Sequence, residues 1–332
     1  MKFFRLALAS AVALALGTSA ALAAKTTLRI TLQLPMKSHL GQNLLLFKNE
    51  IEKTSNGDIA VEIYDSAQLY KDKEVPQAVG SGAIEMGVAS LTRFAGDIPA
   101  VDVFYLPFLF NSEELVRKAT AKGSPVRGAI DEAILDTGNR VLWWQAYGGV
   151  VLLSNGAPIK TPADIKGKKV RVFGKTLGAW IEAAGGVPTS ISGSEQYLAY
   201  QRGTVDVGMS GISGVKSRKL WEVMDTITRT NNADIEFIVV VNDKFWQSLP
   251  DEHKKLIEAA AAKADKTVRD EMSAFETDAF KLAETSGMSV YDPTPDEVAQ
   301  WKADAQPVFD EFLAASGPLG KTVLDAAKAL GN

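Results

Sequence analysis

Arg171 is the residue whose type and position best suit the binding of a small anion. It stands in the run Val170-Arg171-Val172-Phe173, which alternates as a β-strand does, near the expected carboxyl end of that strand. A guanidinium presents a planar fork that binds a carboxylate through two parallel hydrogen bonds. Arg29 has similar apolar neighbours, so the pattern alone also allows Arg171 to be an exposed strand residue.

Residues for most other kinds of chemistry are scarce. The 332 residues include no cysteine and only two histidines, which excludes thiol nucleophiles, disulfides, thiolate metal sites and multi-histidine metal sites. The Gly320-Lys321-Thr322 segment lacks the earlier glycine of a phosphate-binding loop, and no dinucleotide or hydrolase glycine pattern occurs. We expect His253 to be solvated in the first turn of a helix, and His39 to line a cleft or to be structural. We therefore expect no catalytic residues, no cofactor and no metal.

The composition is that of a globular protein of about two domains. Hydrophobic residues make up 46%, charged residues 23%, and the formal net charge is −4. No basic stripe is present, so we expect no nucleic-acid partner. Residues 1–23 are typical of an export signal, because Lys2 and Arg5 precede a short apolar stretch and Ala21-Leu22-Ala23. We expect cleavage near Ala23-Ala24.

Strands and helices are expected to alternate twice along the chain. Residues 28–89 and 170–209 each have the pattern strand, helix, strand, helix, strand, and Ser81–Gly87 is similar to Arg202–Gly208. Chance similarity is the alternative to two related lobes. The repeated order predicts an α/β protein whose two lobes each hold a mainly parallel sheet flanked by helices. Such lobes form a ligand crevice outside the carboxyl ends of their strands.

Two features are expected to connect the lobes. The aromatic stretch Trp143–Gly149 lines the cleft or packs an interdomain wall, and a second crossing is expected near Asn231-Asn232. Asp251–Thr285 has no glycine or proline and carries apolar residues three or four apart, which predicts one helix of roughly 50 Å across both lobes. A coiled-coil dimer helix is the alternative. The expected bounds are 24–148 with about 233–270 for lobe 1, and 149–232 with about 271–332 for lobe 2.

Several segments together resemble the periplasmic solute-binding subunit of tripartite ATP-independent periplasmic (TRAP) transporters, of the DctP type. The resemblance runs from about Thr27 to Leu256 and rests on Gly57–Tyr64 with Gln68-Leu69, Ser81–Gly87, Asp102–Phe110, Ile159–Val172 and Lys219–Val223. It implies a two-lobe periplasmic binding protein fold, type II-like, with a long C-terminal helix spanning both lobes. It also implies a monomer in the periplasm that is not an enzyme. Such a protein captures a small organic carboxylate between closing lobes and delivers it to small and large membrane subunits.

The resemblance also implies roles for particular residues. In that family the arginine of the strand containing Arg171 pairs with a ligand carboxylate, and the loops after the third strand of each lobe contact the ligand. The residues expected to bind the ligand are Arg171, Phe173, Gln33, Ser90, Thr92, Tyr147, Met209, Ser210, Asn231 and Phe237. Gly208–Gly211 lacks an asparagine that the family often has, Val151 stands in the place of a second arginine, and Phe237 replaces a frequent tyrosine. These departures predict an aliphatic or aromatic carboxylate with fewer polar contacts than a sugar acid.

Two other functions stay open at this stage. A binding protein of the same fold could serve a sensor kinase, and nothing within the chain separates that function from transport. A secreted two-lobe hydrolase or isomerase would need a base and an activated nucleophile. With only two histidines in the chain, few residues could act as that base.

Overall fold

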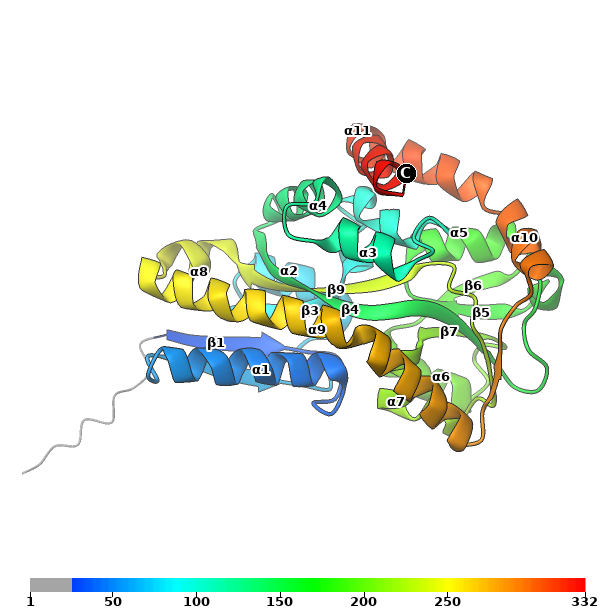
Figure 1. Cartoon of the computed structure of the whole chain (residues 1–332), viewed down its shortest axis with the longest axis horizontal. Coiled ribbons are helices and arrows are strands. Elements are labelled where there is room, and N and C mark those ends of the chain that lie inside the picture. Colours follow the sequence, from blue (N-terminus) through cyan, green and yellow to red (C-terminus); the bar gives the residue numbers. More distant parts are fainter. Residues whose placement is uncertain (1–25, 332) are drawn as a thin grey trace, which may run out of the picture.

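In the computed structural model, residues 26–331 are described, and they form two α/β lobes connected by long strands and helices (Figure 1). The predicted export signal, with its cleavage site near Ala24, lies outside the described residues. Among the helices of residues 26–331, none combines the length and the apolar character needed to cross a membrane.

The elements follow the predicted alternation in both halves of the chain. The strands are β1 (Thr26–Thr31), β2 (Ile59–Tyr64), β3 (Met86–Ser90), β4 (Asn139–Ser154), β5 (Lys169–Val172), β6 (Val187–Ser190), β7 (Gly208–Gly211), β8 (Thr226–Thr228), β9 (Asp234–Asn242) and β10 (Ser289–Tyr291). The α-helices are α1 (His39–Thr54), α2 (Val75–Gly80), α3 (Glu113–Thr120), α4 (Pro125–Leu135), α5 (Lys175–Ala183), α6 (Gln196–Gln201), α7 (Ile212–Arg218), α8 (Asp243–Ser248), α9 (Asp251–Thr285), α10 (Pro295–Ala303) and α11 (Gln306–Leu330). The 3-10 helices are η1 (Asp72–Glu74), η2 (Leu91–Phe94), η3 (Pro99–Tyr105), η4 (Pro162–Ile165), η5 (Gly193–Glu195) and η6 (Leu220–Glu222).

The long strands β4 and β9 tie the two lobes into one sheet. Its order is β10-β8-β4-β9-β3-β1-β2, with β7 also paired to β4, while β5 and β6 form a separate parallel pair. β1 runs parallel to β2 and β3, and β8 runs parallel to β10. β4 and β9 are antiparallel to each other and to the strands they join in the lobes. The predicted two-lobe α/β fold is confirmed, and because β4 and β9 are antiparallel to their neighbours, the large sheet as a whole is mixed.

β4 bends at Gly148, where it passes beneath α9. The register against β9 shifts between Ala146 and Gly148. Gly148 has a φ of +94°, and a Cβ atom there would lie 2.2 Å from Oε1 of Glu276 and 2.7 Å from Cε of Met272. Only glycine meets both conditions, because other residues strain at positive φ and would clash with α9. This bend falls within the predicted first crossing, Trp143–Gly149.

The helix α9 has the predicted bounds, Asp251–Thr285, and lies across both lobes (Figure 1). Its first half packs on α1, where Lys263 pairs with Glu50, and its second half on α7, where Lys216 lies over the Phe275 ring. The apolar face of α9 is thus buried within its own chain, as a spine rather than as a coiled-coil strand. His253 in its first turn is only 7% exposed, with Nδ1 2.9 Å from the Thr26 hydroxyl oxygen. The expectation of a solvated His253 is wrong, because α9 packs on the start of β1.

The last two helices carry the chain from lobe 2 back to lobe 1. Trp301 of α10 packs against Trp180 of α5, with the ring planes tilted by 42°, and donates its Nε1–H to the Lys160 carbonyl at 2.8 Å. α11 then packs against η3, α3 and α4 as well as α5 (Figure 1). The predicted bounds, which gave all of residues 271–332 to lobe 2, therefore do not describe α11. The apolar face of α11, which includes the buried Phe312, must pack against another part of the protein. The sequence pattern of the helix does not tell which lobe it packs against.

Candidate functional site

Arg171 lies near the carboxyl end of β5, where it is buried and has no acidic partner among residues 26–331. It is 3% exposed, its Nε donates to the Ile191 carbonyl at 3.0 Å, and its Nη1 donates to the Met209 carbonyl at 2.5 Å. No described carboxylate forms an ion pair with it. Burial lowers the pKa of Arg171 to about 10, so the group is still a cation at neutral pH. Two carbonyls fix its orientation, and its positive charge is left to be balanced from outside the protein.

A small cavity that opens to solvent lies beside Arg171, between the two lobes. Lobe 1 contributes residues at or after the ends of β1, β2 and β3, and lobe 2 contributes residues at or after the ends of β5, β6 and β7. β4 and β9 contribute Tyr147, Ile235 and Phe237. This is the crevice expected outside the carboxyl ends of the strands. The lining residues are Gln33, Asp72, Ser90, Arg93, Tyr147, Arg171, Phe173, Gly193, Gln196, Ser210, Gly211, Arg218, Ile235 and Phe237.

Seven of the ten predicted binding residues line this cavity, namely Arg171, Phe173, Gln33, Ser90, Tyr147, Ser210 and Phe237. The other three are elsewhere. The Met209 side chain is fully buried, because neighbouring strand residues point to opposite faces and Ser210 takes the cavity side. Thr92 packs against Gly174 instead of facing the cavity. Asn231 lies against Gly149 in a separate hollow beside α9.

Two further arginines reach the cavity that the sequence analysis did not single out. Arg93 donates from Nε to Asp72 at 2.5 Å, and the same carboxylate accepts the Ser90 N–H at 2.8 Å and the Ser90 hydroxyl at 2.7 Å. Arg218, at the end of α7, donates from Nη1 to the Tyr147 hydroxyl at 3.2 Å. No described carboxylate forms an ion pair with Arg218. The only feature of the sequence that could have indicated Arg93 and Arg218 is their position a few residues after the third strand of each lobe.

The charges around the cavity do not balance. Three guanidiniums (Arg93, Arg171 and Arg218) line it with one carboxylate, Asp72, which leaves an excess of two positive charges. Arg218 thus brings a second arginine to the cavity from α7, although Val151 stands where the family often has one. The aliphatic or aromatic carboxylate ligand expected from the sequence stays a prediction. The cavity suits an anion with two negative groups.

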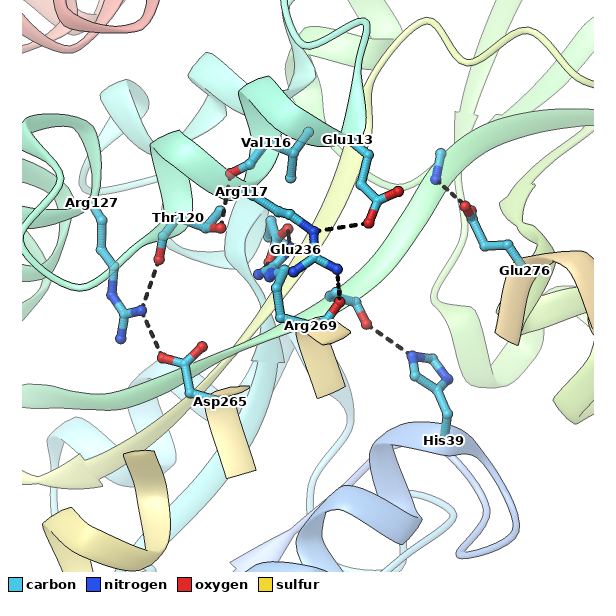
Figure 2. A network of polar contacts seen from close by, with 12 residues as sticks. His39, Glu113, Val116, Arg117, Thr120, Arg127, Glu236, Asp265, Arg269 and Glu276 are labelled. Atoms are coloured by element: carbon cyan, nitrogen blue, oxygen red, sulfur yellow. Dashed lines mark hydrogen bonds and ion pairs between the residues drawn. The ribbon is translucent and has the colours of Figure 1, made fainter. Parts of the chain in front are cut away.

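Tyr147 connects this cavity to α9 through a row of rings. Its ring centroid lies 4.9 Å from Phe237 and 5.6 Å from His39, and His39 lies 4.4 Å from Phe275 of α9. The His39 Nε2 is 2.9 Å from the Ala146 carbonyl (Figure 2), and since a carbonyl only accepts, Nε2 carries the proton. Burial lowers the pKa of His39 to about 4, so the ring is neutral. His39 thus joins α1 to the crossing strand β4 and does not line the cavity.

A second group of charged residues lies on the other face of the crossing strands (Figure 2). Glu236 and Phe237 are neighbours on β9 and point to opposite faces. Glu236 is fully buried and accepts from Nη1 and Nη2 of Arg269 at 2.5 and 2.7 Å. Arg117 pairs with Glu113 at 2.8 Å and with an aspartate of α9 at 3.1 Å. Each of these arginines has a carboxylate partner, so this group joins α9 to β9 and α3.

Residues 32–316 match the family described as bacterial extracellular solute-binding protein, family 7 (DctP). The chain is 29% identical to the C4-dicarboxylate-binding periplasmic protein DctP of Rhodobacter capsulatus, over 97% of each chain. It is 26% identical to the sialic acid-binding periplasmic protein SiaP of Vibrio cholerae, over 90% of this chain and 92% of SiaP.

Two solved structures have the same fold. One is a TRAP periplasmic solute-binding protein from Shewanella oneidensis with bound succinate, with a TM-score of 0.86, 26% identity, and coverage of 92% of this chain and 99% of that one. The other is a sugar acid binding protein from Advenella mimigardefordensis in complex with galactonate, with a TM-score of 0.87, 24% identity, and coverage of 92% and 98%.

Proposed function

The chain belongs to family 7 of the bacterial extracellular solute-binding proteins, and from this premise we propose that it captures a small organic dianion beside Arg171. The observation that carries the proposal is the state of Arg171, which is 3% exposed, oriented by two carbonyls and unpaired with any described carboxylate. A buried charge without a partner is costly for a protein to maintain. A ligand carboxylate in the cavity would supply the missing anion through charge-assisted hydrogen bonds of about 1.5–3 kcal/mol each.

A second carboxylate on the ligand would meet Arg218. Arg93 is already engaged by Asp72, so the two positive charges left over belong to Arg171 and Arg218. A short aliphatic dicarboxylate would neutralise both of these charges. The names of relatives agree, since one is a C4-dicarboxylate-binding protein and a structure of the same fold holds succinate. Succinate is therefore the probe of choice.

The proposal extends to where the protein acts and what receives its ligand. Relatives across nearly the full length are named periplasmic, and residues 1–23 have the pattern of an export signal. We place the mature chain in the periplasm as a monomer. The lobes close on the ligand, and the closed form docks on the small and large membrane subunits of a TRAP transporter.

Titration calorimetry on the purified protein tests the proposal. Succinate should bind at least ~10-fold more tightly than butyrate, which has the same chain length and one carboxylate, because a charge-assisted bond is lost. Arg171→Ala leaves the ligand carboxylate desolvated and unpaired, which costs about 3–5 kcal/mol, a loss of at least ~100-fold in affinity. Arg140→Ala is the control, because Arg140 pairs with Asp243 outside the cavity. An Arg171→Ala affinity within threefold of the parent would reject the role of Arg171.

A further inference from the structure

A contact between the lobes lies next to the cavity but does not line it. Asp102 of η3 in lobe 1 accepts the Thr176 hydroxyl at 2.7 Å and the Thr176 N–H at 3.4 Å, at the start of α5 in lobe 2. Asp102 is 2% exposed. The first N–H groups of a helix have no partner within the helix, and the helix dipole favours a negative charge there. A lobe 1 carboxylate thus caps a lobe 2 helix.

Thr92 makes the other half of this contact, against Gly174. A Cβ atom on Gly174 would lie 2.5 Å from the Thr92 hydroxyl oxygen and 3.3 Å from the Thr92 Cβ. Gly174 has a φ of −153°, an extended conformation that any residue adopts. The backbone of lobe 2 therefore does not require a glycine at this position. The close approach of lobe 1 requires it.

The contact and the cavity are formed by the same two segments of chain. In lobe 1, Thr92 stands beside Arg93, which lines the cavity. In lobe 2, Gly174 directly follows Phe173, which also lines the cavity, and neither Thr92 nor Gly174 does so. A ligand held between these two segments would draw Thr92 and Asp102 onto Gly174 and Thr176.

We propose that Thr92 and Asp102 of lobe 1, seated on Gly174–Thr176 of lobe 2, form a latch that holds the lobes closed and raises ligand affinity without touching the ligand. The inference rests on the proposed function, since it takes the lobes to open for ligand exchange. The apparent affinity for a ligand scales with the fraction of protein in the binding-competent state. Any change that excludes the latched arrangement should weaken binding by the factor by which it depletes the closed form.

The test uses Gly174→Ala, with Gly178→Ala as its matched control. Gly178 is on α5, the helix that Gly174 precedes, but a Cβ atom there meets only ordinary contacts, 3.6 Å from Pro188 and 3.8 Å from Val172. We expect Gly174→Ala to weaken succinate binding by ~10-fold or more, and Gly178→Ala by less than twofold. Adding Thr92→Ala to Gly174→Ala removes the clashing hydroxyl and should restore part of the affinity. A general packing defect would not be repaired in this way.

A second measurement reports the distance between the lobes directly and does not require a ligand. The chain has no cysteine, so spin labels at Lys53→Cys in α1 and Gln201→Cys in α6, both exposed, report the interlobe distance. Gly174→Ala should remove the short-distance population that the parent shows, with and without succinate. The latch is overturned if Gly174→Ala changes neither this distribution nor the affinity. If the parent binds no dicarboxylate but Gly174→Ala still shifts the distances, the proposed function fails and the latch stands.

Discussion

Arg171 is buried and Arg269 is half-buried beside the strands that join the lobes, and their surroundings differ. Arg269 forms two parallel hydrogen bonds with the fully buried Glu236, whereas Arg171 is held by two carbonyl oxygens alone. Burial lowers the pKa of Arg171 to about 10. Burial would also lower the pKa of Arg269, but the attraction of Glu236 outweighs it and raises that pKa above its usual value. Arg269, which has its own carboxylate, joins two elements of the fold. Arg171, which pairs with no described carboxylate, is where we propose that an external anion binds.

The largest loss of folding stability is expected when the carboxylate partner of Arg269 is removed. Glu236→Ala removes the fully buried partner of the half-buried Arg269, so we expect urea denaturation to show a loss of about 3–5 kcal/mol. Arg171→Met removes a cation that pairs with no described carboxylate, so no buried anion is left without a partner. We expect the free energy of unfolding to fall by at most about 1–2 kcal/mol, from the loss of its two hydrogen bonds to carbonyls.

Glu113→Ala is the control for that comparison. Glu113 is the exposed partner of Arg117 at the edge of the same charged group, and its loss should cost under about 1 kcal/mol. Equal losses of stability for Glu236→Ala and Arg171→Met would show that the two arginines do not differ in the way described.

The crossing region should also respond to acid through His39. The folded protein lowers the pKa of His39 to about 4, from 6.5 in the unfolded chain, because burial disfavours the charged ring. Between those values the unfolded chain binds the extra proton, so the stability contribution is complete above pH 6.5 and is lost as the pH falls towards 4. We expect His39 to account for about 1–2 kcal/mol of stability lost between pH 7 and pH 5. His39→Gln, which can still donate to Ala146, should flatten this part of the profile in urea denaturation. An unchanged slope would contradict the assignment.

The smallest effect is expected at an exposed pair between the lobes. Lys71 pairs with Glu195 at 2.8 Å, but the two side chains are 43% and 48% exposed. Surface pairs contribute about 0–1 kcal/mol and are screened by salt, so Lys71→Ala should change succinate affinity by less than ~5-fold, with a smaller change at high salt. Titration calorimetry at low and high salt checks this. A loss as large as that of Gly174→Ala would mean that surface charge, rather than the buried latch, holds the lobes together.

Several parts of the fold and the site could be predicted from the sequence because neighbouring residues decide them. The bounds of α9, Asp251–Thr285, follow from an apolar period that no glycine or proline interrupts. The strand of Arg171 follows from its alternation, whereas the expectation that Gln33 and Ser90 lie at the cavity came from the family resemblance. The assignment of α11 to lobe 2 failed. The sequence of an amphipathic helix shows that one face must be buried, but it does not show which part of the protein buries it.

The pattern of residues by itself determined which segments form strands and helices, and which side chains carry the chemistry to bind a carboxylate. Only the tertiary structure decided which cations keep an anion of their own. Arg269 meets Glu236 across 33 positions of the chain, whereas Arg171 and Arg218 meet no described carboxylate. The uncharged Thr176 likewise meets Asp102 across 74 positions. The physical reason is that Coulomb attraction and desolvation depend on separation and burial in space. Distance along the sequence fixes neither of these once the chain has crossed twice between its lobes.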